Sequence, residues 1–121
     1  MEFTKMGQVE SRFADLIWDN EPLTSKELVE LCNRELQWKK SMTYTVLKKL
    51  CEKGLFQNDG GTVTSLVSRE EYHAGQGVQM VEEAFNGSLP SFVAAFMNRQ
   101  KISAEEIERI QKLIDSYKEE E

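Results

Sequence analysis

The fold is decided by residues 24–67, TSKELVELCNRELQWKKSMTYTVLKKLCEKGLFQNDGGTVTSLV, in which two helical patterns are followed by a pair of strand patterns. Thr24 and Glu27 have the spacing of a capping box, in which the threonine oxygen accepts from a backbone N–H and the glutamate reaches back to the cap. The helix that follows is predicted to turn three apolar side chains inward: Leu28, Leu31 and Cys32.

A second helix is predicted from about Met42 to Lys53, after a polar connection that contains Trp38. Ser41 is expected to cap this helix, and Gly54 marks its end. Its apolar positions Val46, Leu47 and Leu50 predict the face that packs on the core.

The next segments, 55–58 and 62–67, are rich in β-forming residues and flank the turn Asp59-Gly60-Gly61. Glycine-rich two-residue loops are typical of β-hairpins, so a hairpin is predicted here. Upstream of residue 24, four apolar residues share one helical face before the polar turn 19–22: Val9, Phe13, Leu16 and Ile17. Three helices followed by a hairpin is the order of a winged helix-turn-helix.

Downstream of the hairpin, three more helices are expected. A capping box at Ser68 and Glu71 begins the first of them, the break at Gly87-Ser88 precedes the second, and Ser103 with Glu106 caps the third. The fold class is therefore mainly α with a small β-hairpin wing. Residues 1–68 are predicted to form a winged helix-turn-helix DNA-binding domain, and residues 69–121 a helical dimerisation domain.

The charge distribution separates the two halves of the chain. The net charge is −6 over 121 residues, which by itself argues against a nucleic-acid partner. Residues 1–70, however, hold ten Lys and Arg against eleven Asp and Glu, whereas residues 71–121 hold five against ten. Residues 34–53 have a local excess of +4. A compact basic patch is therefore available at the predicted helix 42–53.

This helix is predicted to bind the major groove of double-stranded DNA, with its N-terminal tip at the base edges. A lysine-bearing amphipathic helix is often only a solvated face, and winged helices also serve as protein-interaction modules without sequence-specific DNA binding, which is the alternative function. The candidate DNA-binding residues are Lys39, Lys40, Ser41, Met42, Thr43, Tyr44, Thr45, Lys48 and Lys49.

The second half carries more apolar surface than three short helices can bury alone. Packing against the chain's own winged domain is one outcome. A twofold homodimer is preferred, because it would place two recognition helices on two operator half-sites. The candidate dimerisation residues are Val81, Phe85, Leu89, Phe92, Val93, Phe96, Ile107, Ile110, Leu113 and Ile114.

Other functions find little support. No apolar run approaches the length of a membrane span and no signal segment precedes the first helix, so a cytoplasmic protein without direct membrane insertion is expected. Cys32 and Cys51 are interpreted as reduced core thiols, with a disulfide left open. His73, the only histidine, has no ligand at metal-binding spacing, and no phosphate-binding glycine pattern or nucleophile signature is present, so no metal, cofactor or enzymatic activity is predicted.

The order of several short motifs resembles the penicillinase repressor (BlaI/MecI) family from about residue 8 to residue 117. They are Glu10, Ile17-Trp18, Leu23-Thr24, Glu27-Leu28, Thr45, Leu47, Leu50, Lys53-Gly54, Ser68 to Tyr72, Phe85 to Leu89 and Ser103 to Glu106. The resemblance implies a dimeric winged-helix repressor. It also implies inactivation by proteolysis in the fifth helix, triggered by a membrane sensor protease, with release of antibiotic-resistance genes.

The chain departs from the family pattern in four respects. Met42-Thr43-Tyr44 replaces the family's usual start of the recognition helix, so a different operator sequence is expected. The hairpin has Thr62 to Ser65 where the family has arginine and tyrosine. The scissile Asn-Phe pair aligns with Ala95-Phe96, the candidate cleavage site, and the Cys-x-Cys pair of copper-responsive relatives is absent.

Overall fold

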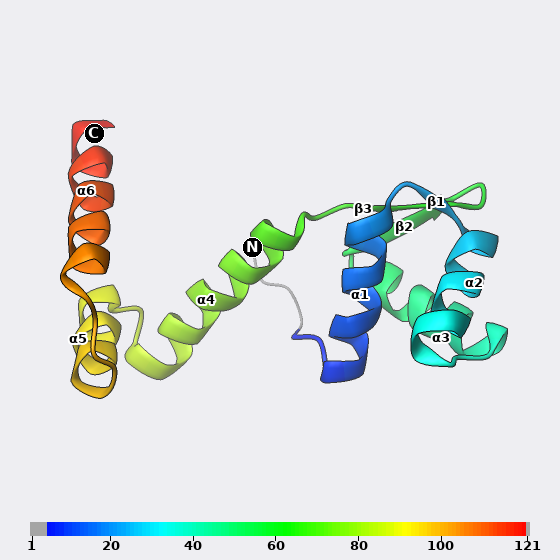
Figure 1. The fold of residues 1–121 in the computed structure, drawn as a ribbon, viewed down its shortest axis with the longest axis horizontal. Coiled ribbons are helices and arrows are strands. Elements are labelled where there is room, and N and C mark those ends of the chain that lie inside the picture. The colour runs from blue at the N-terminus through cyan, green and yellow to red at the C-terminus, as the bar shows by residue number, and fades with distance from the viewer. Residues whose placement is uncertain (1–4, 121) are drawn as a thin grey trace. The chain divides into compact units, whose positions relative to one another are not determined.

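Three helices and a small sheet form the N-terminal part of the chain, in the predicted order (Figure 1). The computed structural model describes residues 5–120. The elements of this part are α1 (Gln8–Asn20), β1 (Leu23–Thr24), α2 (Ser25–Leu36), α3 (Lys40–Glu52), β2 (Phe56–Asp59) and β3 (Thr62–Ser65). They are followed by α4 (Arg69–Phe85), α5 (Leu89–Arg99) and α6 (Ala104–Glu120), so the fold class is confirmed.

The sheet has the strand order β1-β3-β2, and both pairings are antiparallel. Val63 of β3 lies opposite Leu23 on one side and Asn58 on the other. At the tip of the β2–β3 hairpin Gly60 and Gly61 have φ values of 59° and 92°, which glycine adopts without steric cost. The hairpin was predicted, whereas β1 was not, because its two residues overlap the capping box of α2.

The core lies between the sheet and the inner faces of α1, α2 and α3. The predicted inward residues of α3, Val46, Leu47 and Leu50, are all buried. For α1 the prediction is confirmed at Phe13 and Ile17 but wrong at Val9, which is 53% exposed although Met6, just before the helix, is buried in the core. The fully buried large side chains include Phe13, Ile17, Leu28, Leu50, Leu55, Phe56 and Val63.

The first turn of α4 is attached to α1 by polar and aromatic contacts. Arg69 lies 3.1 Å from Asp15 and 2.7 Å from Asp19, with its guanidinium over the ring of Trp18. The indole N–H of Trp18 donates to the carbonyl of Val67 at 3.0 Å. The predicted capping box of α4 is confirmed, since Ser68 and Glu71 exchange side-chain and backbone hydrogen bonds.

The chain divides into two compact units between Gln79 and Met80, so the beginning of α4 belongs with the winged part. The assignment of DNA binding to residues 1–68 and of dimerisation to residues 69–121 stays a prediction. Within the described residues, no helix is long and apolar enough to cross a membrane. Cys32 and Cys51 are free thiols, the first buried and the second half-buried.

The C-terminal unit is built from the end of α4, α5 and α6. Ser88 caps α5 by accepting from the backbone N–H of Ser91 at 3.2 Å, and Ser103 caps α6 by accepting from Glu106 at 3.1 Å. Phe92 lies 5.6 Å from Phe85 and 6.0 Å from Phe96, measured between ring centroids. An aromatic row therefore joins the end of α4 to α5.

Candidate nucleic-acid interface

The turn between α2 and α3 fixes the position at which α3 begins. Gln37 takes a left-handed conformation with φ 57°, which ends α2 and redirects the chain. The next residue, Trp38, stacks its ring on Phe13 of α1 with centroids 5.4 Å apart and planes at 19°. Asn33 of α2 donates from its side chain to the Trp38 carbonyl at 3.1 Å. Trp38 therefore connects α1, α2 and the first turn of α3, a role that sequence reasoning missed although a tryptophan in a polar connection was a visible signal.

The two faces of α3 differ sharply in burial. Its inward face is made by Thr43, Val46, Leu47 and Leu50, which pack in the core. Eight of the nine candidate DNA-binding residues are exposed: Lys39, Lys40, Ser41, Met42, Tyr44, Thr45, Lys48 and Lys49. The structure therefore places these eight on the exposed surface of α3 and at the residue just before its N-terminus.

Thr43 is the exception, because its side chain is only 1% exposed. It lies one turn before Leu47 on the inward face, and its hydroxyl faces the thiol of Cys32 in α2. Burial raises the pKa of the Cys32 thiol above its ordinary value, and the neighbouring Thr43 hydroxyl, whose oxygen is buried without a hydrogen-bond partner among the described residues, opposes that rise. The Thr43 side chain is therefore not exposed for contact with DNA in this structure, in contrast to the expectation for the other eight residues.

The predicted cap of α3 is wrong. The helix begins at Lys40 with Lys39 as its N-cap residue, and no side-chain cap hydrogen bond is formed there in the described structure. Ser41 instead lies inside the first turn, where its carbonyl accepts from the hydroxyl of Thr45 at 2.9 Å. The backbone N–H groups of this turn are thus left to solvent or to an anion.

Ion pairing divides the basic patch. Glu10 of α1 lies 3.3 Å from the ammonium of Lys53 and 3.6 Å from that of Lys49. The backbone N–H of Gly7 and these two lysines hold the pKa of the Glu10 carboxyl below its ordinary value of 4.5, against the effect of burial. None of the ion pairs within the described part of the chain includes Lys39, Lys40 or Lys48. These three are the cations most available to a phosphate strand.

The wing formed by β2 and β3 brings no positive charge to this surface. Residues 54–68 contain no lysine or arginine and carry Asp59 beside the glycine turn. The backbone N–H of Ser25, at the start of α2, donates to the carbonyl of Gly61 at 2.8 Å, which ties the wing tip to α2. The wing is thus a short, neutral-to-acidic neighbour of the helix-turn-helix.

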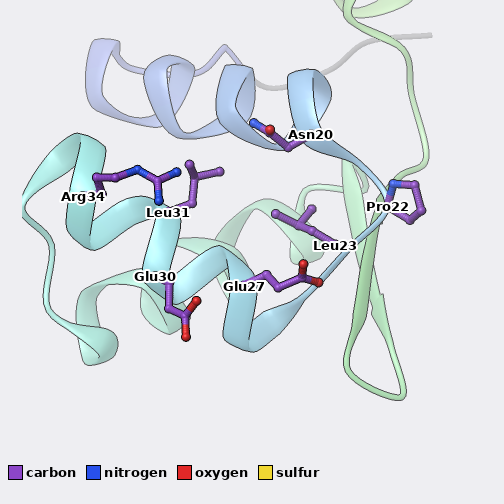
Figure 2. Close-up of a pocket in the computed structure, with 7 residues that line it drawn as sticks. All are labelled: Asn20, Pro22, Leu23, Glu27, Glu30, Leu31 and Arg34. Carbon is purple, nitrogen blue, oxygen red and sulfur yellow. The ribbon is translucent and has the colours of Figure 1, made fainter.

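A surface hollow of about 260 Å³ lies at the end of α1, β1 and the outer face of α2 (Figure 2). Glu27 borders it, but its carboxylate already accepts from the backbone N–H of Thr24 at 2.9 Å as part of the confirmed capping box. That hydrogen bond lowers the pKa of Glu27. No group of metal-binding side chains occurs among the described residues, here or elsewhere. The hollow is therefore explained by the packing of the capped helix. It is lined by Asn20, Pro22, Leu23, Glu27, Glu30, Leu31 and Arg34.

The C-terminal unit presents an uncovered apolar surface. Six of the candidate dimerisation residues are exposed, with Leu113 reaching 72%: Leu89, Phe96, Ile107, Ile110, Leu113 and Ile114. The other four, Val81, Phe85, Phe92 and Val93, are half-buried. A groove of about 270 Å³ runs between α5 and α6, with Phe92, Phe96 and Ile110 among its lining. Ala95, of the candidate cleavage pair, is half-buried in the middle of α5.

Comparison with known proteins agrees with these features. A family model described as penicillinase repressor matches residues 6–116, nearly the whole described chain. The chain is also similar to the penicillinase repressor of Bacillus licheniformis, with 22% identity over 118 residues that cover 94% of this chain and 92% of that one. The expected resemblance is confirmed, and the chain belongs to the penicillinase repressor family of DNA-binding transcriptional repressors.

Proposed function

We propose that this protein represses transcription as a homodimer that binds a palindromic operator through α3 of each subunit. The observation that carries the proposal is the division of α3 into a buried face and an exposed face that begins with unpaired lysines. An exposed helix of this length fits the major groove, and a twofold dimer would repeat it on a second half-site. Family membership supports the repressor role.

Phosphate contacts are assigned to Lys39, Lys40 and Lys48. Three such contacts in each of two subunits give a predicted slope of about −5 for log affinity against log salt concentration, at about −0.9 per contact. Lys49 would add to this only by leaving Glu10, because the two already lie 3.6 Å apart. Binding should therefore be tight at low salt and should weaken steeply as salt rises.

Band-shift titrations of the full chain on its own promoter region, at several salt concentrations, test this proposal. Lys48→Ala should reduce the slope by about 2, since one contact is lost in each subunit. Lys101→Ala removes one charge from the C-terminal unit and should leave the slope unchanged. Absence of a saturable, sequence-dependent complex at low salt would overturn the proposal.

One observation favours the alternative of a protein-interaction module. The wing, which grips phosphate in many winged helices, has no positive charge here, and the whole chain carries a net charge of −6. In that case α3 would contact an acidic protein surface with the same lysines. The band-shift titration distinguishes the two functions, because only the repressor function requires an affinity that depends on base sequence.

The dimer is proposed to form through the exposed apolar residues of α5 and α6. Two copies would cover side chains such as Leu113 and Phe96 that neither copy buries alone. The operator's twofold symmetry would then follow from the symmetry of the protein.

Inactivation by cleavage between Ala95 and Phe96 is proposed from the family resemblance, with a membrane sensor protease as the triggering partner. A cut there would divide α5 and separate its last turn and α6 from the rest of the chain, and so divide the proposed dimer surface while leaving α3 intact. The bond lies inside a helix, so the helix must open before a protease can reach it. Immunoblotting of cells exposed to a β-lactam should reveal a fragment ending at residue 95. Repressor that stays full-length while its target genes are induced would refute cleavage.

A further inference from the structure

The exposed face of α3 has an unusual composition for a helix that reads base edges. From Lys40 to Glu52 it contains no arginine, asparagine or glutamine. Together with lysine, these are the side chains that form paired hydrogen bonds to guanine and adenine in the major groove, and the lysines of α3 are assigned above to phosphates or paired with Glu10. What α3 presents instead is methyl, aromatic, thioether and hydroxyl groups, together with lysines.

We propose that α3 reads the 5-methyl groups of thymine with Met42, Tyr44 and Thr45, so that T·A pairs, not guanines, specify each operator half-site. The inference rests on the proposed function and names the bases that it requires. Apolar contact with the thymine methyl group is the one major-groove signal that needs no hydrogen-bonding side chain.

The burial pattern places these three residues where such contacts are made. Met42 is 41% exposed and Tyr44 is 38% exposed, although both belong to the first two turns of a helix whose other apolar residues are in the core. Large apolar side chains left in water next to a lysine cluster are costly unless a ligand covers them. The thymine methyl group is a DNA surface of matching chemistry.

Local hydrogen bonds favour the same interpretation for Thr45. Its hydroxyl already donates to the Ser41 carbonyl at 2.9 Å, so it has no proton left for a base acceptor. The groups that remain are its γ-methyl and an acceptor lone pair. Thr45 is therefore suited to an apolar contact more than to a hydrogen bond with the acceptor edge of guanine.

Tyr44 is coupled to a phosphate-binding group. The Lys40 ammonium lies 6.0 Å from the centroid of the Tyr44 ring, within the range of a cation–π contact. The ring is thus held beside a positive charge that can neutralise the phosphate next to the contacted base. The lysine contributes affinity, and the ring contributes the choice of base.

The test begins with selection of duplexes from a randomised 30-base-pair pool by the full chain. The expected result is enrichment of an inverted repeat with T·A pairs in each half-site. Failure to enrich any sequence would overturn the proposed function and this inference with it. An enriched site is then synthesised with deoxyuridine in place of each half-site thymine in turn, which removes only the methyl group.

At a contacted position, replacing thymine with deoxyuridine in one half-site should weaken binding about fourfold, the effect expected for losing one buried methyl contact. Replacement in both half-sites should weaken it about sixteenfold. Equal affinity for the thymine and deoxyuridine duplexes at every position would overturn methyl readout while leaving the proposed function intact.

Variants assign the discrimination to Tyr44. Tyr44→Ala should lose the preference for thymine over deoxyuridine at one position, whereas Tyr44→Phe, which keeps the ring, should retain it. Lys39→Ala is the matched control, since it should weaken both duplexes equally. If Tyr44→Ala still prefers thymine at every position, the assignment to this residue is wrong.

Discussion

At the scale of one residue, Thr43 is a polar residue that occupies a core position. Its hydroxyl is buried on the inward face of α3, with the Cys32 thiol as its neighbour. A thiol is a weak hydrogen-bond partner. The hydroxyl therefore gains little in the folded state to offset the free-energy cost of removing it from water. Thr43→Val should therefore raise the free energy of unfolding by about 1 kcal/mol, measured by urea denaturation.

The same variant distinguishes a role of Thr43 in core packing from a role in DNA binding. Operator affinity of Thr43→Val should stay within about twofold of the original, because the residue faces the core. Thr45→Val is the companion change. Thr45 lies one turn after Ser41 on the exposed side of α3, so this variant alters the proposed DNA-binding surface. A tenfold loss of affinity in Thr43→Val, without loss of stability, would show that Thr43 contacts DNA after all.

Glu10 gives the winged unit a pH dependence whose sign follows from its pKa. The carboxylate accepts from the N–H of Gly7 and pairs with Lys53, which lowers its pKa in the folded state below the ordinary 4.5. The stabilisation is therefore complete above about pH 4.5 and is lost as the pH falls through the lower, folded-state pKa.

Glu10→Gln provides the comparison. The original protein should be more stable than this variant at pH 7 in urea denaturation, and the difference should shrink as the pH is lowered below 4.5. Glu35→Gln, at an exposed position outside every ion pair of the described residues, is the control and should show no such trend. A difference that stays constant down to pH 3 would contradict the assignment.

At the scale of the element, periodicity identified the helices because each carries a regular apolar stripe, which α1, α2 and α3 bury and which α5 and α6 leave half-buried or exposed. The spacing of Val46, Leu47 and Leu50 was sufficient to orient α3, and the capping boxes of α2 and α4 were visible as residue pairs. The start of α3 was not predictable in this way, since Lys39 caps it without a side-chain hydrogen bond. Strand β1 was missed because two residues carry no periodicity.

The candidate interface was predictable to the same extent. Apolar spacing implied which residues of α3 face outward, except at Thr43, whose polar side chain gave no sign of its burial. Long-range pairings had no signal in one sequence, because residues such as Glu10 and Lys53 are 43 positions apart. The division of the basic patch into paired and available lysines therefore required the fold.

The turn before α3 is the element whose geometry should matter most for binding. Trp38 is half-buried and stacked on Phe13, so Trp38→Ala should lower the free energy of unfolding by about 2 kcal/mol, less than for a fully buried tryptophan. Because Lys39 and Lys40 follow directly, operator affinity should fall even where the variant is fully folded.

Trp38→Phe keeps an aromatic ring on Phe13 and should recover most of both losses. Urea denaturation gives the stability, and band shifts at a temperature where circular dichroism shows full folding give the affinity. Normal affinity in folded Trp38→Ala would mean that the turn does not position the tip of α3.

At the scale of the whole molecule, the proposed dimer is the feature on which operator symmetry depends. Phe96 lies on the aromatic row of α5, borders the groove with α6 and is 47% exposed. Burying a phenylalanine stabilises an interface by roughly 1.5 to 3 kcal/mol, and a symmetric interface contains each residue twice. Phe96→Asp would place a charge in that surface on both subunits, so the variant should sediment as a monomer.

Loss of the dimer should also weaken operator binding, because one winged unit contacts only half of a palindromic site. Asn98→Asp adds the same charge at an exposed polar position of α5 and should remain dimeric. Sedimentation and band shifts on the same preparations then compare assembly with affinity. A Phe96→Asp protein that stays dimeric and binds normally would place the interface elsewhere, and a cut beside Phe96 could then no longer be expected to release the operator.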